Sequence, residues 1–130
     1  MDAKDLMIGD WTQKREGDHF VNVQVLGVID NLVTYLCGST EGTITANGIE
    51  PIPITSEILE KNGFEWDSYH KQFTIVCGTI HIGWGFYKNC LSISDWSDDG
   101  DSQISSIRCV YVHELQHAIR VCGINKEIVL

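Results

Sequence analysis

The stretch of sequence with the strongest helical pattern is ISSIRCVYVHELQHAIRVC, residues 104–122, which contains no proline or glycine. Its apolar side chains recur every three or four residues, a spacing that places them on one face of an α-helix. They are Ile104, Ile107, Tyr111, Leu115, Ala118, Ile119 and Cys122. Ser102 offers a capping hydroxyl before the stretch, and Gly123 is a stop signal after it. The pattern predicts one C-terminal helix of about five turns.

Within this stretch, residues 113–117 are His-Glu-Leu-Gln-His, which matches the HExxH pattern of zinc metallopeptidases. Histidines four residues apart on a helix project to the same side and can bind one zinc ion. The glutamate beside the first histidine can act as general base on the metal-bound water. The candidate metal ligands are therefore His113 and His117, and the candidate catalytic residue is Glu114.

Two features of the sequence count against zinc catalysis. A catalytic zinc needs a third protein ligand, but the residues after His117 contain no histidine and a single carboxylate, Glu127. A further alternative is a non-catalytic metal site formed by His113, His117 and an upstream ligand such as His81 or Asp95. At about 100° per residue, both histidines also fall nearly opposite the apolar stripe, so we expect a solvated or interface face of the helix. We therefore predict no catalytic, cofactor or metal site, with the zinc site as the alternative.

Short strands are indicated throughout the first 53 residues. Residues 19–29 alternate apolar and polar side chains, the period of a half-buried strand. A β-branched and aromatic run follows at residues 32–36, and Asn47-Gly48 is a typical hairpin turn. Because short antiparallel strands gain stability by closing on themselves and removing their edges, we predict a small SH3-like β-barrel over residues 1–53.

Residues 54–130 are predicted to form the second part of one compact unit. Thr55 is a good N-cap and Asn62-Gly63 a good stop signal for a helix of about two turns. Three strands follow, at residues 72–76, 79–86 and 90–96. The predicted fold class is α+β, with the SH3-like β-barrel followed by an antiparallel sheet that packs on the long C-terminal helix.

Composition narrows the classes of function. The 130-residue chain carries 18 acidic and 9 basic side chains and a formal net charge of −9, which argues against a nucleic-acid-binding surface. No apolar run approaches the roughly 20 residues of a membrane span. The five cysteines form no CxxC pair. Their odd number and the charged, leaderless start predict free thiols in a reducing compartment, the cytoplasm.

Two other groups of residues could suggest a ligand. The acidic run DWSDDGD at residues 95–101 resembles the start of a calcium loop, but Ser106 stands where the loop needs a glutamate, so we predict a solvated turn. The tryptophans are expected in the core, with the wall of a small-molecule pocket as the alternative. They are Trp11, Trp66, Trp84 and Trp96.

Three segments carry a resemblance to a known family: IGDW at residues 8–11, IEPIPITSEILEKNGF at 49–64, and YVHELQH at 111–117. In this order, and over nearly the whole chain, they resemble a family of short proteins from gut Bacteroidales genomes, their phages and mobile elements. Members of that family often carry Gln at the position of Glu114 and Asn at that of His117. The resemblance thus implies a helix kept for its packing, and it brings no established activity with it.

These observations favour a non-enzymatic protein-interaction module of phage or mobile-element origin, acting in the cytoplasm of a bacterial host. Its expected partner is a protein, with a small ligand less favoured, and neither nucleic acid nor membrane is expected. The alternative is a minimal zinc-dependent hydrolase or metallopeptidase with His113 and His117 as ligands and Glu114 as base. A third hypothesis, suggested by the net charge alone, is an acidic protein that blocks a nucleic-acid-binding host protein.

Overall fold

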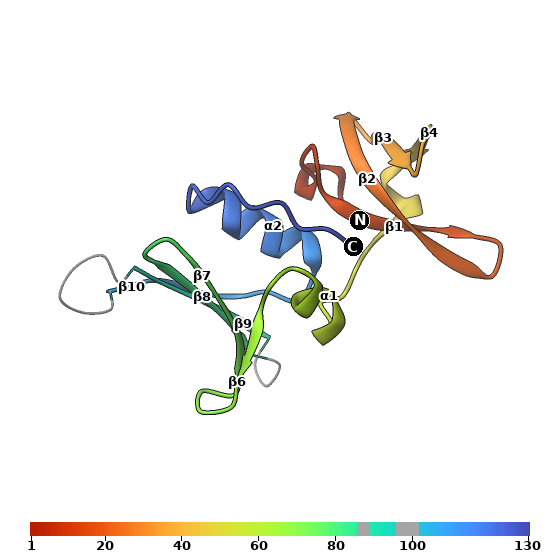
Figure 1. The fold of residues 1–130 in the computed structure, drawn as a ribbon. Helices are drawn as coiled ribbons and strands as arrows, with labels where there is room; N and C mark the ends of the chain where they lie inside the picture. Colours follow the sequence, from red (N-terminus) through yellow and green to blue (C-terminus); the bar gives the residue numbers. More distant parts are fainter. Residues whose placement is uncertain (86–88, 96–101) are drawn as a thin grey trace. The chain divides into compact units, whose positions relative to one another are not determined.

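The computed structural model describes residues 1–85, 89–95 and 102–130, with the backbone alone at 102–105. The described chain is mostly β-structure and contains two five-stranded antiparallel sheets (Figure 1). Its elements are η1 (Ala3–Asp5), β1 (Trp11–Glu16), β2 (His19–Ile29), β3 (Leu32–Cys37), β4 (Thr40–Thr45), η2 (Ala46–Gly48), β5 (Ile49–Pro51), α1 (Ser56–Lys61), β6 (Glu65–Asp67), β7 (Gln72–Cys77), β8 (Ile80–Gly85), β9 (Cys90–Asp95), β10 (Ser102–Arg108) and α2 (Val112–Val121).

The chain divides into two compact units, each with one sheet. Unit 1 comprises Met1–Pro53 and Tyr111–Gln116, and unit 2 comprises Ile54–Val110 and His117–Leu130. Helix α2 therefore supplies its first residues to unit 1 and its last residues to unit 2.

Unit 1 is built on a sheet with the strand order β4-β3-β2-β1-β5. The first four strands form a meander, and β5 returns to pair with β1. The alternation predicted for residues 19–29 is present in β2, where Val23 and Val25 are fully buried and Asn22 is exposed. The core of the unit consists of Ala3, Leu6, Val23, Val25, Val33, Ala46 and Ile49.

The SH3-like β-barrel predicted for residues 1–53 is wrong, because this sheet is not closed. Within the described chain β4 pairs with β3 alone and β5 with β1 alone, which leaves the sheet two edges. The prediction assumed that short strands must close to protect their edges. An edge can also be protected by a short strand that contains proline, and β5 is three residues long and ends at Pro51.

Unit 2 contains the sheet β10-β9-β8-β7-β6. Phe73, Trp84 and Leu91 lie directly opposite one another on its three central strands and are all buried. The Trp84 indole N–H donates a hydrogen bond of 2.7 Å to the backbone carbonyl of Cys109. Trp84 is thus a core residue with its polar group satisfied, as predicted.

The predicted C-terminal helix over residues 104–122 is wrong in its first half. Ser102–Arg108 forms β10, in which Ile107 pairs with Leu91 of β9, and helix α2 begins only at Val112. The serines and isoleucines of this segment have modest helix propensity, and pairing with a neighbouring strand overrides their helical spacing. The fold is accordingly mostly β, with one short C-terminal helix, and not α+β with a long one.

Thr12 of β1 provides a test of the packing of unit 1. Its side chain is fully buried, and its Oγ1 has no hydrogen-bond partner in the described parts of the chain. Thr12→Val keeps the β-branched shape and removes a hydroxyl that is costly to desolvate. We expect the substitution to raise the free energy of unfolding in urea by about 1 kcal/mol. The same change at the exposed Thr43 should alter it by less than about 0.5 kcal/mol. A loss of stability at Thr12 would show that the hydroxyl has a partner after all.

Candidate functional site in helix α2

Glu114, the candidate general base, is used at the start of helix α2. Its Oε1 accepts a hydrogen bond of 3.0 Å from the backbone N–H of Tyr111, the residue before the first helical residue. This is the glutamate half of a capping box, and it places a negative charge at the positive end of the helix dipole. The carboxylate that zinc catalysis would need beside the metal therefore stabilises the helix terminus.

Gln116, inside the same motif, joins the helix to the start of β1. Its Oε1 accepts a hydrogen bond from the Trp11 backbone N–H at 2.8 Å, and its Nε2 donates to the Gly9 carbonyl at 2.9 Å. These are the two backbone groups that a residue of a parallel neighbouring strand would bond. The buried carboxamide thus acts as a peptide group at this position.

The two histidines do not lie on the solvated face that was predicted. His113 is 7% exposed, and its ring stacks on that of Tyr111 with the centroids 6.0 Å apart. His117 is half-buried. The prediction treated α2 as a surface helix with one apolar stripe, whereas His113 and Gln116 are buried as well as its apolar residues Val112, Leu115, Ala118 and Ile119.

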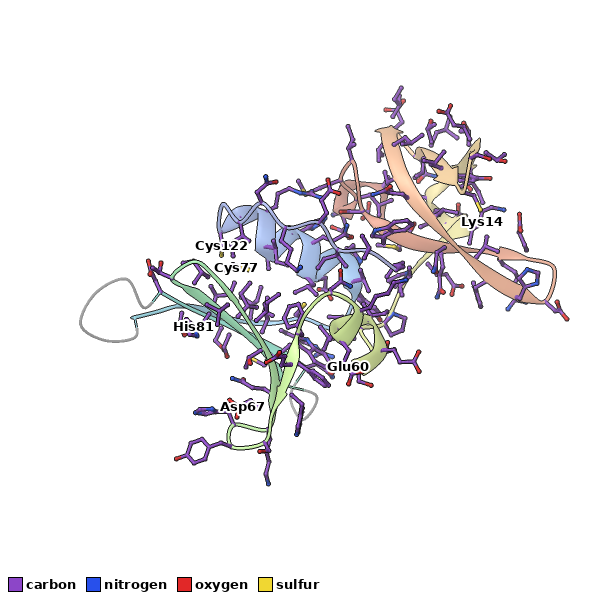
Figure 2. All side chains as sticks on the ribbon, in the orientation of Figure 1. Lys14, Glu60, Asp67, Cys77, His81 and Cys122 are labelled. Carbon is purple, nitrogen blue, oxygen red and sulfur yellow. The ribbon has the colours of Figure 1, made fainter. Side chains whose placement is uncertain are left out.

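The two candidates for a third zinc ligand point to opposite faces of the sheet of unit 2. His81 of β8 (labelled in Figure 2) pairs with Ser94, and Asp95 of β9 pairs with Ile80. Because side chains alternate along a strand, Asp95 lies on the face of the buried Ile82, and His81 lies on the other face. In the described parts of the chain, no three His, Cys, Asp or Glu side chains form a group that could hold a metal ion. These residues do not fit a catalytic zinc, which needs three protein ligands.

The cysteines and the acidic run add no ligand set. All five cysteines are free thiols, as predicted, with Cys109 buried and the others half-buried. Residues 96–101 of the acidic run, which include Trp96, lie outside the described residues, so the predicted solvated turn stays a prediction.

The structure also presents a surface that the sequence analysis missed, the turn between β6 and β7. Asp67, labelled beside this turn in Figure 2, fixes its conformation. Its Oδ1 accepts hydrogen bonds from the backbone N–H groups of Tyr69 and His70, at 3.0 and 3.2 Å, and its Oδ2 lies 2.6 Å from His70 Nδ1. An aspartate that bonds backbone groups two and three residues ahead is typical of turns, and this signal was present in Asp-Ser-Tyr-His at residues 67–70.

Strand β6 and the turn after it expose two large aromatic side chains, Trp66 and Tyr69. Tyr69 is 87% exposed, and its ring meets the edge of the His70 ring with the centroids 4.8 Å apart. Trp66 is 52% exposed, so the prediction that it lies in the core is wrong, and it packs edge-on against the buried Phe73 at 5.1 Å. We call Trp66, Tyr69 and His70 the aromatic hairpin.

The deprotonated, charged form of Asp67 favours an ordered turn. The hydrogen bond to the His70 side chain, with those from the backbone of His70 and Tyr69, holds the pKa of Asp67 below its ordinary value of 3.8. A carboxyl group with a lowered pKa in the folded state contributes stability above its ordinary pKa and loses it as the pH falls through the lowered value. The turn therefore keeps its full set of bonds at neutral and mildly acidic pH.

Comparison with protein-family models, with curated proteins and with solved structures finds no match to this chain. The resemblance to a Bacteroidales phage and mobile-element family stays a prediction. Among the described residues, no helix combines the length and the apolar character needed to cross a membrane.

Substitutions at Glu114 test whether this residue caps helix α2 or acts as a catalytic base. Glu114→Ala removes both the acceptor and the charge at the helix terminus, so we expect the free energy of unfolding to fall by about 1–2 kcal/mol. Glu114→Gln keeps the acceptor for Tyr111 and should cost only about 0.3–1 kcal/mol. Urea denaturation of the two variants beside the wild type measures both values.

The control for the Glu114 variants is metal dependence. Protein purified without a histidine tag should keep the same Tm with added zinc and with chelator, because no third ligand accompanies His113 and His117 in the described residues. Stoichiometric zinc, together with a lower Tm in chelator and an unchanged stability of Glu114→Ala, would instead support the zinc hydrolase.

Proposed function

We propose that this protein is a non-enzymatic protein-interaction module and that the aromatic hairpin is its binding surface. The observation that carries the proposal is Tyr69, a large side chain that is almost fully exposed yet stands on a turn held by three contacts from Asp67. An isolated exposed aromatic residue needs no explanation. Here Trp66 and Tyr69 lie in one hairpin whose turn backbone is held by Asp67, and exposed aromatic residues of this kind are enriched at protein-binding surfaces.

A turn with a fixed backbone conformation favours binding. A flexible loop loses conformational entropy when it binds, and that loss is subtracted from the binding free energy. The bonds from Asp67 to the backbone of Tyr69 and His70 fix the turn before any partner arrives. Tyr and Trp also have few rotatable bonds for their contact area, so little further entropy is lost at the side chains.

The partner that suits this surface is a protein. Small-molecule sites are concave and enclose most of their ligand, whereas Tyr69 is open to solvent. The hairpin carries the carboxylates of Glu65 and Asp67 and a single lysine, Lys71, so it offers no cluster of cations for nucleic acid. We also propose that the protein originates from a phage or mobile element, on the basis of the family resemblance. We propose that it acts in the host cytoplasm, on the basis of its cysteines.

Photo-crosslinking from the hairpin tests this function. Benzoylphenylalanine replaces Tyr69 in one variant and Val121 in the control, because both side chains are 87% exposed. In cells, we expect the Tyr69 variant to crosslink to a specific protein that the Val121 variant does not capture. Binding of that purified protein, measured by calorimetry, should weaken by about thirtyfold or more in Trp66→Ser/Tyr69→Ser. Identical crosslinks from both positions, or unchanged affinity in the double variant, would contradict the proposal.

A further inference from the structure

The four sheet edges of the described chain differ in how they are protected. They are formed by β4 and β5 in unit 1 and by β6 and β10 in unit 2. Natural proteins keep an edge from pairing with other chains by making it short, by placing proline or lysine on it, or by introducing a bulge. β5 and β6 are three residues long, and β5 ends at Pro51. β10 has a register shift between Gln103 and Ser105.

Strand β4, Thr40–Thr45, has only one feature of this kind, the charged side chain of Glu41. All six residues pair with β3 in an unbroken register, and the strand contains no proline, lysine or arginine. Four of its side chains are exposed: Thr40, Glu41, Thr43 and Thr45. Within the described chain β4 pairs with β3 alone, so the backbone donors and acceptors of its outer edge lie outside the ladder and can bond a further strand.

The two faces of the sheet next to β4 offer different surfaces. On the core side, Ile44 packs against the core of unit 1, and Tyr35 of β3 lies across Gly42, where an added Cβ would meet the Tyr35 side chain. On the other side, Glu41 and Thr43 are exposed. A strand added here would meet apolar and aromatic groups on one face and a carboxylate with threonines on the other.

Unit 1 is acidic, so it favours binding of a strand that carries positive charge. The unit contains nine Asp and Glu residues and three Lys and Arg residues, and Glu41 is the one charged side chain of β4. This charge repels a second copy of the chain and attracts a basic segment. A lysine or arginine opposite Glu41 would form a favourable cross-strand pair.

We propose that β4 is a docking edge for an extended, basic segment of a partner protein, which adds to the sheet as a sixth strand. Main-chain hydrogen bonds provide the affinity in this mode of recognition, and alternate side chains provide the specificity. An apolar side chain of the segment lies beside Ile44 and Tyr35, and a cationic one lies opposite Glu41. The inference goes beyond the proposed function and uses the other unit of the chain, so either surface can fail without the other.

The probe for this edge is an acetylated peptide of alternating lysine and valine, about eight residues long. Titrated into the 15N-labelled full chain, it should shift the amide signals of Thr40–Thr45 and slow their hydrogen exchange. The same peptide with all backbone nitrogens methylated cannot donate to the sheet, and one with glutamate in place of lysine carries the wrong charge. We expect both control peptides to bind at least about fivefold more weakly.

Two charge reversals on exposed glutamates of the same sheet serve as matched variants. Glu41→Lys should weaken the lysine peptide by about fivefold or more and strengthen the glutamate peptide. Glu50→Lys, on the protected edge strand β5, should change neither. Trp66→Ser/Tyr69→Ser should bind the lysine peptide as the wild type does, which separates this inference from the function of the aromatic hairpin.

Four results would overturn the inference: no binding at millimolar peptide, equal binding of the methylated peptide, signal changes that fall outside β4 and β3, or equal effects of the two charge reversals. Analytical ultracentrifugation tests whether a second copy of the chain binds this edge instead. A dimer of the wild type that Glu41→Lys abolishes would assign the edge to a second copy of the chain and would also overturn the inference.

Discussion

The carboxamide of Gln116 holds the first turns of helix α2 to the start of strand β1. It bonds the Gly9 carbonyl and the Trp11 N–H, more than one hundred residues away in the sequence. Removing such a partner from a buried backbone group costs about 1–3 kcal/mol. With Glu114 capping the same helix, the residues between the two histidines of the HExxH-like motif are engaged in holding the fold together.

Unit 2 contains a second carboxamide with the same role. Asn62, at the end of α1, donates from Nδ2 to the Val129 carbonyl and accepts at Oδ1 from the Val129 N–H, both at 2.8 Å. Each unit is thus held to a segment distant in sequence by a buried, uncharged side chain that bonds as a peptide group does. Glu114 and Gln116 of the HExxH-like motif thus both make structural hydrogen bonds, and exposed turns and edges are surfaces on which a function can be built.

The sequence predicts the secondary structure of a segment well where local signals determine it, and poorly where pairing with a distant segment does. The strand at residues 19–29 and the cap at Thr55 follow from local signals, and both are present, the cap with a hydrogen bond from Ile58 N–H to Thr55 Oγ1. Residues 104–108 have a helical spacing, but pairing with β9 makes them a strand. The HExxH spacing likewise says nothing about where Gln116 bonds, because its partners at Gly9 and Trp11 are set by the tertiary fold.

The stability of Gln116→Glu as a function of pH tests most directly whether this motif is structural. The variant keeps the size of the side chain and an acceptor for the Trp11 N–H, but above its pKa it turns a carboxylate oxygen toward the Gly9 carbonyl. Protonation restores the donor, so the folded state binds the proton more tightly than the unfolded state, and the variant regains stability as the pH falls. Urea denaturation relative to the wild type should show a loss of about 2 kcal/mol or more at pH 7 that shrinks toward pH 4.5. A variant as stable as the wild type at pH 7 would contradict the account.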